Sequence, residues 1–173
     1  MDGMSRGGRW ALVGAALLAL GACGQSGSNT SAGGAPETST APTTPVTLTD
    51  AQKKALVAEL PAAYQAADLS NGEAKIAICR SCHSFNQGGD DMTGPNLWGV
   101  FGRKAGSKAS FTYSDDMKNA GWTWDADHID KWITNPRGVL AGTKMTYAGM
   151  ENPADRRDVI AYLKTITSPA PKA

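Results

Sequence analysis

The order of apolar and polar residues predicts a short N-terminal apolar segment, a polar connection and a helical domain. An apolar run at residues 10–20 is followed, over residues 24–49, by Gly, Ser, Thr, Ala and Pro with almost no large apolar side chain. A stretch of this composition cannot bury enough apolar surface to offset the entropy of folding. We therefore expect residues 24–49 to be a flexible linker that precedes the folded part of the chain.

Helical spacing of apolar residues accounts for much of the remaining chain. Ser or Thr followed three residues later by Gln or Glu predicts helix starts at Thr49 and Ser70. The first helix should end near Leu60, before a proline, and later helices are expected at 125–135 and after Asn152. The apolar residues that define these helices are Ile76, Ile78, Ile129, Trp132, Ile133, Val159, Ile160, Tyr162, Leu163 and Ile166.

Between these helices, residues 86–114 are rich in glycine and polar turn residues, which predicts loops. Strand patterns are weak elsewhere, so the predicted fold class is all-α. The domain has few apolar residues from which to build a core, so we expect a bound cofactor to supply much of it. The 17 Lys and Arg residues nearly balance the 16 Asp and Glu residues, and no basic patch indicates binding to nucleic acid.

The segment from Cys79 to His83 carries the strongest chemical signal. Its cysteines, Cys79 and Cys82, are separated by two residues and followed directly by His83, which is the attachment pattern of a c-type haem. Each sulfur would add across a haem vinyl group, and the imidazole would bind the iron. The same cysteine spacing occurs in thioredoxin-like redox pairs and in zinc sites. Only Cys23 and His128 could complete a zinc site, so haem attachment is the favoured interpretation.

The N-terminus has the pattern of an export signal, because Arg6 and Arg9 precede the apolar run. The sequence Leu20-Gly21-Ala22-Cys23 resembles the bacterial lipoprotein cleavage box, which predicts lipidation of Cys23 and anchoring on the periplasmic side of a bacterial membrane. An ordinary signal peptide or an uncleaved signal anchor are the alternatives. The predicted parts are a signal peptide at 1–22, a lipidated N-terminus and linker at 23–49, a short helical lead-in at 50–69 and a haem domain at 70–168.

A haem carrier of this kind needs a second axial ligand from the same domain. The side chains with suitable donor atoms are Met92, Met117, His128, Met145 and Met150. Sequence spacing alone does not choose among them. Each methionine that is not a ligand is expected to fill the core.

Several short segments resemble, in the same order, segments of the class I, mitochondrial-type cytochromes c. They are Thr93-Gly94-Pro95-Asn96-Leu97, Phe101-Gly102-Arg103-Lys104-Ala105-Gly106, Asn135-Pro136 and Gly142-Thr143-Lys144-Met145. The resemblance runs from about Asn71 to Thr167. It implies a small class I cytochrome c fold wrapped around one covalent haem, with the sulfur of Met145 as the distal iron ligand. A thioether opposite an imidazole stabilises ferrous iron and raises the potential.

The resemblance also implies which residues surround the haem. The carbonyl of Pro95 accepts a hydrogen bond from the ring of His83, which fixes the tautomer of the imidazole. The propionate carboxylates are held by Arg103, Tyr113 and Trp124.

On the distal side of the haem, the resemblance implies two supporting residues, and this chain departs from the family at two further positions. Thr143 and Asn135 are implied to support the loop of Met145. Trp132 stands where the family commonly has a tyrosine near the methionine sulfur, and Met117 stands where an asparagine often binds an internal water. We therefore expect an altered polar network beside the distal ligand.

The function implied by the resemblance is that of a single-electron carrier of a respiratory chain, not that of an enzyme. The iron would cycle between Fe(II) and Fe(III), taking electrons from a cytochrome bc complex and passing them to a terminal oxidase. The chain is expected to be monomeric. Two other classes stay open, a haem enzyme of the peroxidase or nitrogen-oxide reductase type and a haem-based gas-binding module, and both need an open iron position.

Overall fold

The computed structural model describes residues 47–171. The predicted signal peptide, Cys23 and the linker as far as residue 46 lie outside this range. The helices are α1 (Asp50–Ala58), α2 (Ala62–Gln65), α3 (Leu69–Lys75), the 3-10 helix η1 (Ile76–Ser81), α4 (Asp115–Lys118), α5 (Ala126–Thr134), α6 (Pro136–Val139) and α7 (Pro153–Thr167). Within residues 47–171, strand pairing is limited to one isolated bridge between Lys104 and Thr123. The predicted all-α fold is thus confirmed.

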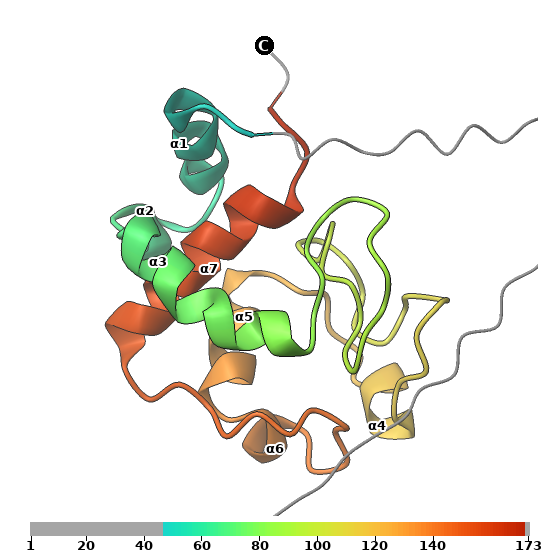
Figure 1. Cartoon of the computed structure of the whole chain (residues 1–173). Helices are drawn as coiled ribbons and strands as arrows, with labels where there is room; N and C mark the ends of the chain where they lie inside the picture. The colour runs from blue at the N-terminus through green and yellow to red at the C-terminus, as the bar shows by residue number, and fades with distance from the viewer. Residues whose placement is uncertain (1–46, 172–173) are drawn as a thin grey trace, which may run out of the picture. The chain divides into compact units, whose positions relative to one another are not determined.

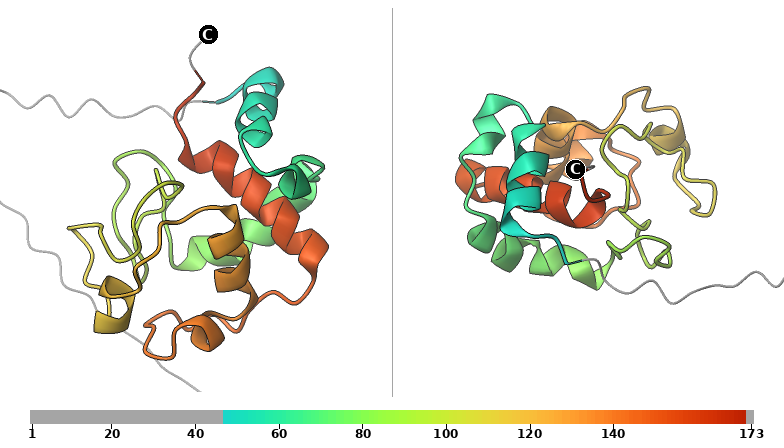
Figure 2. Two further views of the ribbon diagram at one scale, coloured as in Figure 1. Left: turned by 180° about the vertical axis from the view of Figure 1, so that it is seen from behind. Right: turned by 90° about the horizontal axis from the view of Figure 1, so that it is seen from above.

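Helix α7 forms the centre of the helical part and packs against α1, α2, α3 and α5 (Figure 1). It begins as the sequence predicts, with Asn152 capping the amide of Ala154 at 2.9 Å and a proline in its first turn. Most of its predicted apolar stripe is buried, with Ile166 partly buried. The loops between η1 and α4 lie on the other side of the domain from α1 and α2 (Figure 2).

The crossing of α3 and α7 is unusually close at Gly72. A Cβ atom at this position would lie 2.2 Å from the carbonyl oxygen of Asp158 and 2.8 Å from Cβ of Tyr162. Beside the crossing, the Asp158 carboxylate, only 3% exposed, accepts from the amide of Asp68 at 3.0 Å and from Asn71 at 2.9 Å. A side chain at residue 72 would force the two helices apart, because both contacts involve backbone or Cβ atoms that cannot rotate away.

The N-cap of α3 differs from the sequence prediction. We expected Ser70 to cap the helix, but Asp68 does so, and its carboxylate accepts from the amides of Ser70 and Asn71 at 2.9 and 3.1 Å. An aspartate accepts more strongly than a serine hydroxyl because it is charged. Glu73, the expected partner in the capping box, instead accepts from the hydroxyl of Tyr162 on α7 at 2.8 Å.

After Lys75 the backbone changes from an α-helix to the 3-10 helix η1, which ends at Ser81, within the Cys79–His83 segment. The tighter winding changes which residues face inward. Ile76 is 1% exposed and belongs to the main core, whereas Ile78 is 55% exposed. The two isoleucines therefore have different roles, although both lie in the apolar pattern of the sequence.

The lead-in before α3 is part of the folded core. Thr49 and Gln52 form the predicted capping box at the start of α1. The helix ends at Ala58, and a second short helix, which we did not predict, follows the proline. From this second helix Tyr64 donates a hydrogen bond to Asp127 of α5 at 2.8 Å. The buried apolar side chains here are Leu48, which lies in the predicted linker, and Leu56, Val57, Leu60 and Tyr64 of the lead-in.

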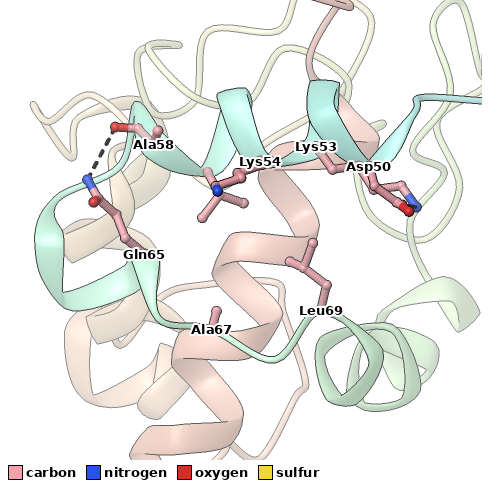
Figure 3. A pocket seen from close by; sticks show the side chains of 8 residues that line it. Asp50, Lys53, Lys54, Ala58, Gln65, Ala67 and Leu69 are labelled. Carbon is pink, nitrogen blue, oxygen red and sulfur yellow. Dashed lines mark hydrogen bonds and ion pairs between the residues drawn. The ribbon is translucent and has the colours of Figure 1, made fainter.

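An open groove separates α1 from the segment between Gln65 and Leu69 (Figure 3). Lys53 and Lys54 lie along one side, and the side-chain amide of Gln65 donates to the carbonyl of Ala58 at 3.2 Å. None of the residues that the sequence predicts to bind a cofactor lines this groove.

Helix α5 matches the predicted span closely. Asp125 caps it by accepting from the amide of His128 at 2.8 Å, and Ile129 and Trp132 are buried. The short helix α6, which we did not predict, follows at once because Asn135 accepts from the amide of Gly138 at 2.9 Å. Within residues 47–171, no helix has the length and apolar character needed to cross a bilayer.

We predict that Gly72→Ala destabilises the protein. Glycine to alanine in a helix interior normally stabilises by about 1 kcal/mol, because alanine loses less backbone entropy. At this crossing the added methyl group should instead lower the free energy of unfolding by about 1–3 kcal/mol. Denaturant unfolding of the purified protein measures the change, with Ala74→Ser on the exposed side of the same helix as the control. An increase in stability would show that α3 and α7 can separate at no cost.

Candidate functional site

The attachment segment forms a tight turn at the end of η1. The amides of Cys82 and His83 both donate to the carbonyl of Cys79, at 3.1 and 3.0 Å. Cys79 and Cys82 form no disulfide and are partly buried, and burial raises the pKa of the Cys79 thiol. The turn holds both sulfurs and the imidazole on one short piece of chain.

The imidazole of His83 is oriented by the loop that follows it. Its Nδ1 lies 2.7 Å from the carbonyl oxygen of Pro95. A carbonyl can only accept, so Nδ1 carries the hydrogen and Nε2 keeps a lone pair. Burial lowers the pKa of His83, while the bond to Pro95 acts in the opposite direction, so the neutral ring is favoured. This is the state in which an imidazole binds a metal.

Gly94 packs against the same ring. A Cβ atom at this position would lie 2.3 Å from Cε1 of His83, so no side chain fits there. The amide of Gly94 donates to the carbonyl of Cys82 at 2.8 Å, which ties this loop back to the attachment segment. The glycine thus lets the loop approach closely enough for the neighbouring carbonyl of Pro95 to reach the histidine.

A group of polar residues holds the Pro95 loop in place. Asp91 accepts from the amide of Asn96 at 2.7 Å, from the hydroxyl of Ser110 at 2.6 Å and from the ammonium of Lys108 at 2.7 Å. Burial alone would raise the pKa of Asp91, but these donors outweigh it and hold the pKa at about 2. Asn96 is itself buried and donates to the hydroxyl of Ser84 at 2.7 Å.

The structure brings the predicted propionate-binding residues together. The amide of Trp124 donates to the carbonyl of Arg103 at 2.9 Å, so these residues are adjacent on paired stretches of chain. Tyr113 lies within electrostatic reach of Arg103, whose positive charge opposes the rise in the pKa of Tyr113 that burial causes. The guanidinium also donates to the carbonyls of Trp98 and Asn96, both at 3.2 Å, which fixes its position. Burial lowers the pKa of Arg103 and raises the pKa of Tyr113.

The Met145 loop is fastened at several points. The hydroxyl of Thr143, a buried residue, accepts from the amide of Met145 at 3.1 Å, as the resemblance implied. Asp116 accepts from the amide of Gly142 at 2.9 Å, and Lys144 donates to the carbonyl of Thr112 at the same distance. These bonds join the loop to the segment that contains Tyr113.

The sulfur of Met145 accepts a hydrogen bond from the indole nitrogen of Trp132 at 3.2 Å. Trp132 and Met117 are both buried, in one small apolar cluster with Ala105. The altered polar network that we expected therefore consists of an indole donor and an apolar neighbour. Asn135 caps α6, the short helix that precedes this loop in the chain.

The other potential ligands have different surroundings. Met117 and Met150 pack in the two apolar clusters, in agreement with a role in the core. Met92 is 49% exposed, so the expectation that it fills the core is wrong. The ring of His128 lies 2.8 Å from the carboxylate of Asp125 and stacks on Trp122 with ring centroids 6.0 Å apart.

Sequence reasoning missed two features of the site. The indole N–H of Trp122 is buried and has no hydrogen-bond partner among the described residues. The sequence signal that could have identified Trp122 is its position two residues before Trp124, a predicted propionate-binding residue. The Asp91–Lys108 ion pair was also missed, because no short motif joins residues that are far apart in sequence.

Comparison with known proteins assigns the same segment to one family. A family model described as "Cytochrome c" matches residues 70–167. A cytochrome c2 from Rhodomicrobium vannielii is 47% identical over 103 residues, which are 60% of this chain and 82% of the relative. A cytochrome c homolog from Bradyrhizobium diazoefficiens is 41% identical over 104 residues, 60% of this chain and 56% of the relative. The solved structure of cytochrome cH from Methylobacterium extorquens has 39% identity and a TM-score of 0.53, covering 57% of this chain and 98% of that one.

We predict that Asp91→Asn destabilises the protein in a pH-dependent way. The folded pKa of about 2 lies below the usual value of 3.8, so the ionised carboxylate stabilises the fold. This contribution is fully present above about pH 4 and is lost as the pH falls through the folded pKa.

The expected difference in unfolding free energy between Asp91→Asn and the unmodified protein is about 1–2 kcal/mol near neutral pH. It should shrink steadily between pH 4 and 2. Denaturant unfolding at a series of pH values measures it, with Asp90→Asn at the exposed neighbouring carboxylate as the control. A difference that does not vary with pH would mean that the charge of Asp91 has no role.

Proposed function

The chain belongs to the cytochrome c family, class I, and carries a covalent haem c, and we propose that Cys79, Cys82 and His83 are its attachment residues. Members of the family are electron carriers, not enzymes. Each thiol would add across a vinyl double bond of the haem, with sulfur bonding to one carbon and the hydrogen passing to the other, so no oxidant would be needed. The bound haem supplies a one-electron Fe(II)/Fe(III) couple.

The observation that carries this proposal is the hydrogen bond between His83 and Pro95. Because Nδ1 carries the hydrogen, Nε2 of the neutral ring keeps a lone pair that can bind a metal. The carbonyl of Pro95 increases the basicity of that nitrogen. Gly94, which has no side chain, lets the Pro95 loop approach the ring, and two cysteines that form no disulfide lie within the same turn. The buried N–H of Trp122 also fits a site that brings an additional acceptor, such as a haem carboxylate.

On the other side of the iron, Met145 is the distal ligand in this proposal. The bonds that fasten its loop support the role, because they restrict where the sulfur can lie in either oxidation state. Arg103, Tyr113 and Trp124 hold the propionates through a guanidinium, a phenol and an indole N–H.

The proposed partners are a cytochrome bc complex as the electron donor and a terminal oxidase as the acceptor. A histidine and a thioether on the iron favour Fe(II) and give a potential suited to accepting electrons from quinol oxidation. In the same proposal the chain is exported, lipidated at Cys23 and held on the periplasmic side of a bacterial membrane. The signal-like N-terminus and the Leu20-Gly21-Ala22-Cys23 sequence support this location.

We predict that Met145→Ala opens the sixth iron position. The variant should lose the methionine–iron charge-transfer band of the ferric form, bind carbon monoxide rapidly in the ferrous form and have a lower potential. Met117→Leu, a change in the same apolar cluster, is the control and should keep the band. An unchanged ferric spectrum in Met145→Ala would identify another residue as the ligand. Rapid carbon monoxide binding by the unmodified protein would instead favour a haem enzyme or a gas-binding module.

Replacement of the proposed lipid-bearing residue, Cys23→Ser, should prevent maturation at this site and remove the acyl chains from the mature protein. In a form truncated to start near Asp50, electron transfer from quinol to oxidase in membrane vesicles should slow by about tenfold or more at equal total protein, because confinement near the partners is lost. Ser26→Ala is the control in the linker. Mass spectrometry of the membrane fraction checks for acyl chains on Cys23. An unmodified N-terminus at another residue would contradict lipidation, and the absence of quinol-dependent reduction by the isolated bc complex would contradict the proposed donor.

A further inference from the structure

Trp122 and Trp124 extend from the same face of one short stretch of chain. The residue between them, Thr123, is exposed and forms the antiparallel bridge with Lys104. Successive side chains in such a pairing point to opposite faces, so the two indoles share a face. They meet edge to face, with ring centroids 5.6 Å apart and an interplanar angle of 82°. The structure thus places a second indole directly beside Trp124, a proposed propionate donor.

The indole N–H of Trp122 lacks an acceptor in the described part of the chain. Its Nε1 is buried, and no residue among 47–171 accepts from it. About nine in ten or more buried polar groups have a partner, since an unpaired one is destabilising. The indole packs on the cluster of Ala105, Met117 and Trp132, whose side chains carry no oxygen. The acceptor is therefore a group other than these side chains.

The position of the Trp122 indole is fixed from its other side by His128. The imidazole stacks on the indole with ring centroids 6.0 Å apart and an interplanar angle of 14°, and its Nδ1 lies 2.8 Å from the carboxylate of Asp125. The backbone of Trp122 is also held, because its carbonyl accepts from the amide of Ala105 at 2.9 Å. Turning the N–H outward to reach bulk water would break the stack, so the acceptor has to come to the indole.

We propose that Trp122 is a further haem-binding residue, and that its N–H donates to a haem propionate together with Trp124. The inference rests on the proposed placement of the propionates beside Arg103, Tyr113 and Trp124. Tyr113 and Trp124 pack on the same apolar cluster as Trp122, so the three side chains surround one region. A carboxylate has about four acceptor positions, so it can accept from a second indole without giving up the first.

This hydrogen bond has a consequence for the acidity of the propionate. A donor to a carboxylate favours its charged form, so Trp122 makes the propionate a stronger acid. An ionised carboxylate near the iron stabilises Fe(III) by attraction, and protonation of the carboxylate therefore raises the potential. Among the proposed neighbours, Arg103 stays charged over this pH range and Tyr113 stays neutral, because burial raises the pKa of its phenol. The pH at which the potential rises thus reports on the donors to the propionate.

The first test measures the potential of the haem-loaded protein at a series of pH values. Trp122→Phe keeps a ring but removes the N–H, and it should weaken the propionate as an acid by about three- to tenfold. The rise in potential then moves to higher pH. Trp124→Phe should move it in the same direction. Trp98→Phe is the matched control, because its indole belongs to neither apolar cluster, and it should leave the profile unchanged.

The second test leaves Trp122 in place. Low-spin ferrous haem is diamagnetic, so indole N–H resonances can be followed by NMR in the reduced protein. The measurement uses the His128→Gln variant, which removes the imidazole, the other group beside the indole that titrates near neutral pH. The Trp122 resonance, assigned through its contact with the Trp124 ring, should shift over the pH range in which the propionate ionises.

The outcomes separate this inference from the placement of the haem. If Trp124→Phe moves the potential profile and Trp122→Phe does not, the N–H of Trp122 meets a buried water or a ring face, and the inference is overturned. A Trp122 resonance that does not change with pH overturns it as well. If neither variant moves the profile, the proposed placement of the propionates fails first and this inference fails with it.

Discussion

The close crossing of α3 and α7 at Gly72 is the contact on which the rest of the domain depends. It brings two helices from opposite ends of the domain to van der Waals distance and buries the Asp158 carboxylate beside them. Because η1 continues directly from α3, the crossing also determines where the attachment segment lies. A change in the position of α3 would move both thiols and His83 together.

The two sides of the site are held by different kinds of interaction. On the His83 side, charged and polar groups around Asp91 and Asn96 fix the loop that carries Pro95. On the Met145 side, the loop is fastened by hydrogen bonds at its ends, while the sulfur itself lies against an apolar cluster. This division suits an electron carrier. A rigid polar scaffold reduces rearrangement when the iron changes its charge, and an apolar distal side keeps water away from the ligand.

The sequence predicts well those features that depend on short patterns. The capping box at Thr49 and the start of α7 after Asn152 each need only a few adjacent residues, and the structure has them in those places. The sequence analysis placed the N-cap of α3 at Ser70, whereas the structure has it at Asp68. Both residue types are acceptable caps, and the choice depends on Asp158 from α7, which accepts a hydrogen bond from the amide of Asp68. The resemblance places Trp132 near the sulfur of Met145, but the hydrogen bond from its indole N–H could not be foreseen. A departure from the family at one position gives no information on where a larger side chain will direct its N–H.

The packing of the lead-in on α7 has a mechanical consequence. A pulling force applied to the chain at residue 47 would act first on the buried side chains of α1, which begins only three residues later and lies against α7. The load would then pass into α7, against which α2, α3 and α5 also pack, before it could run along the chain into α3 and η1. Because the lead-in is packed on α7, tension at the N-terminal end does not act directly along the chain on Cys79.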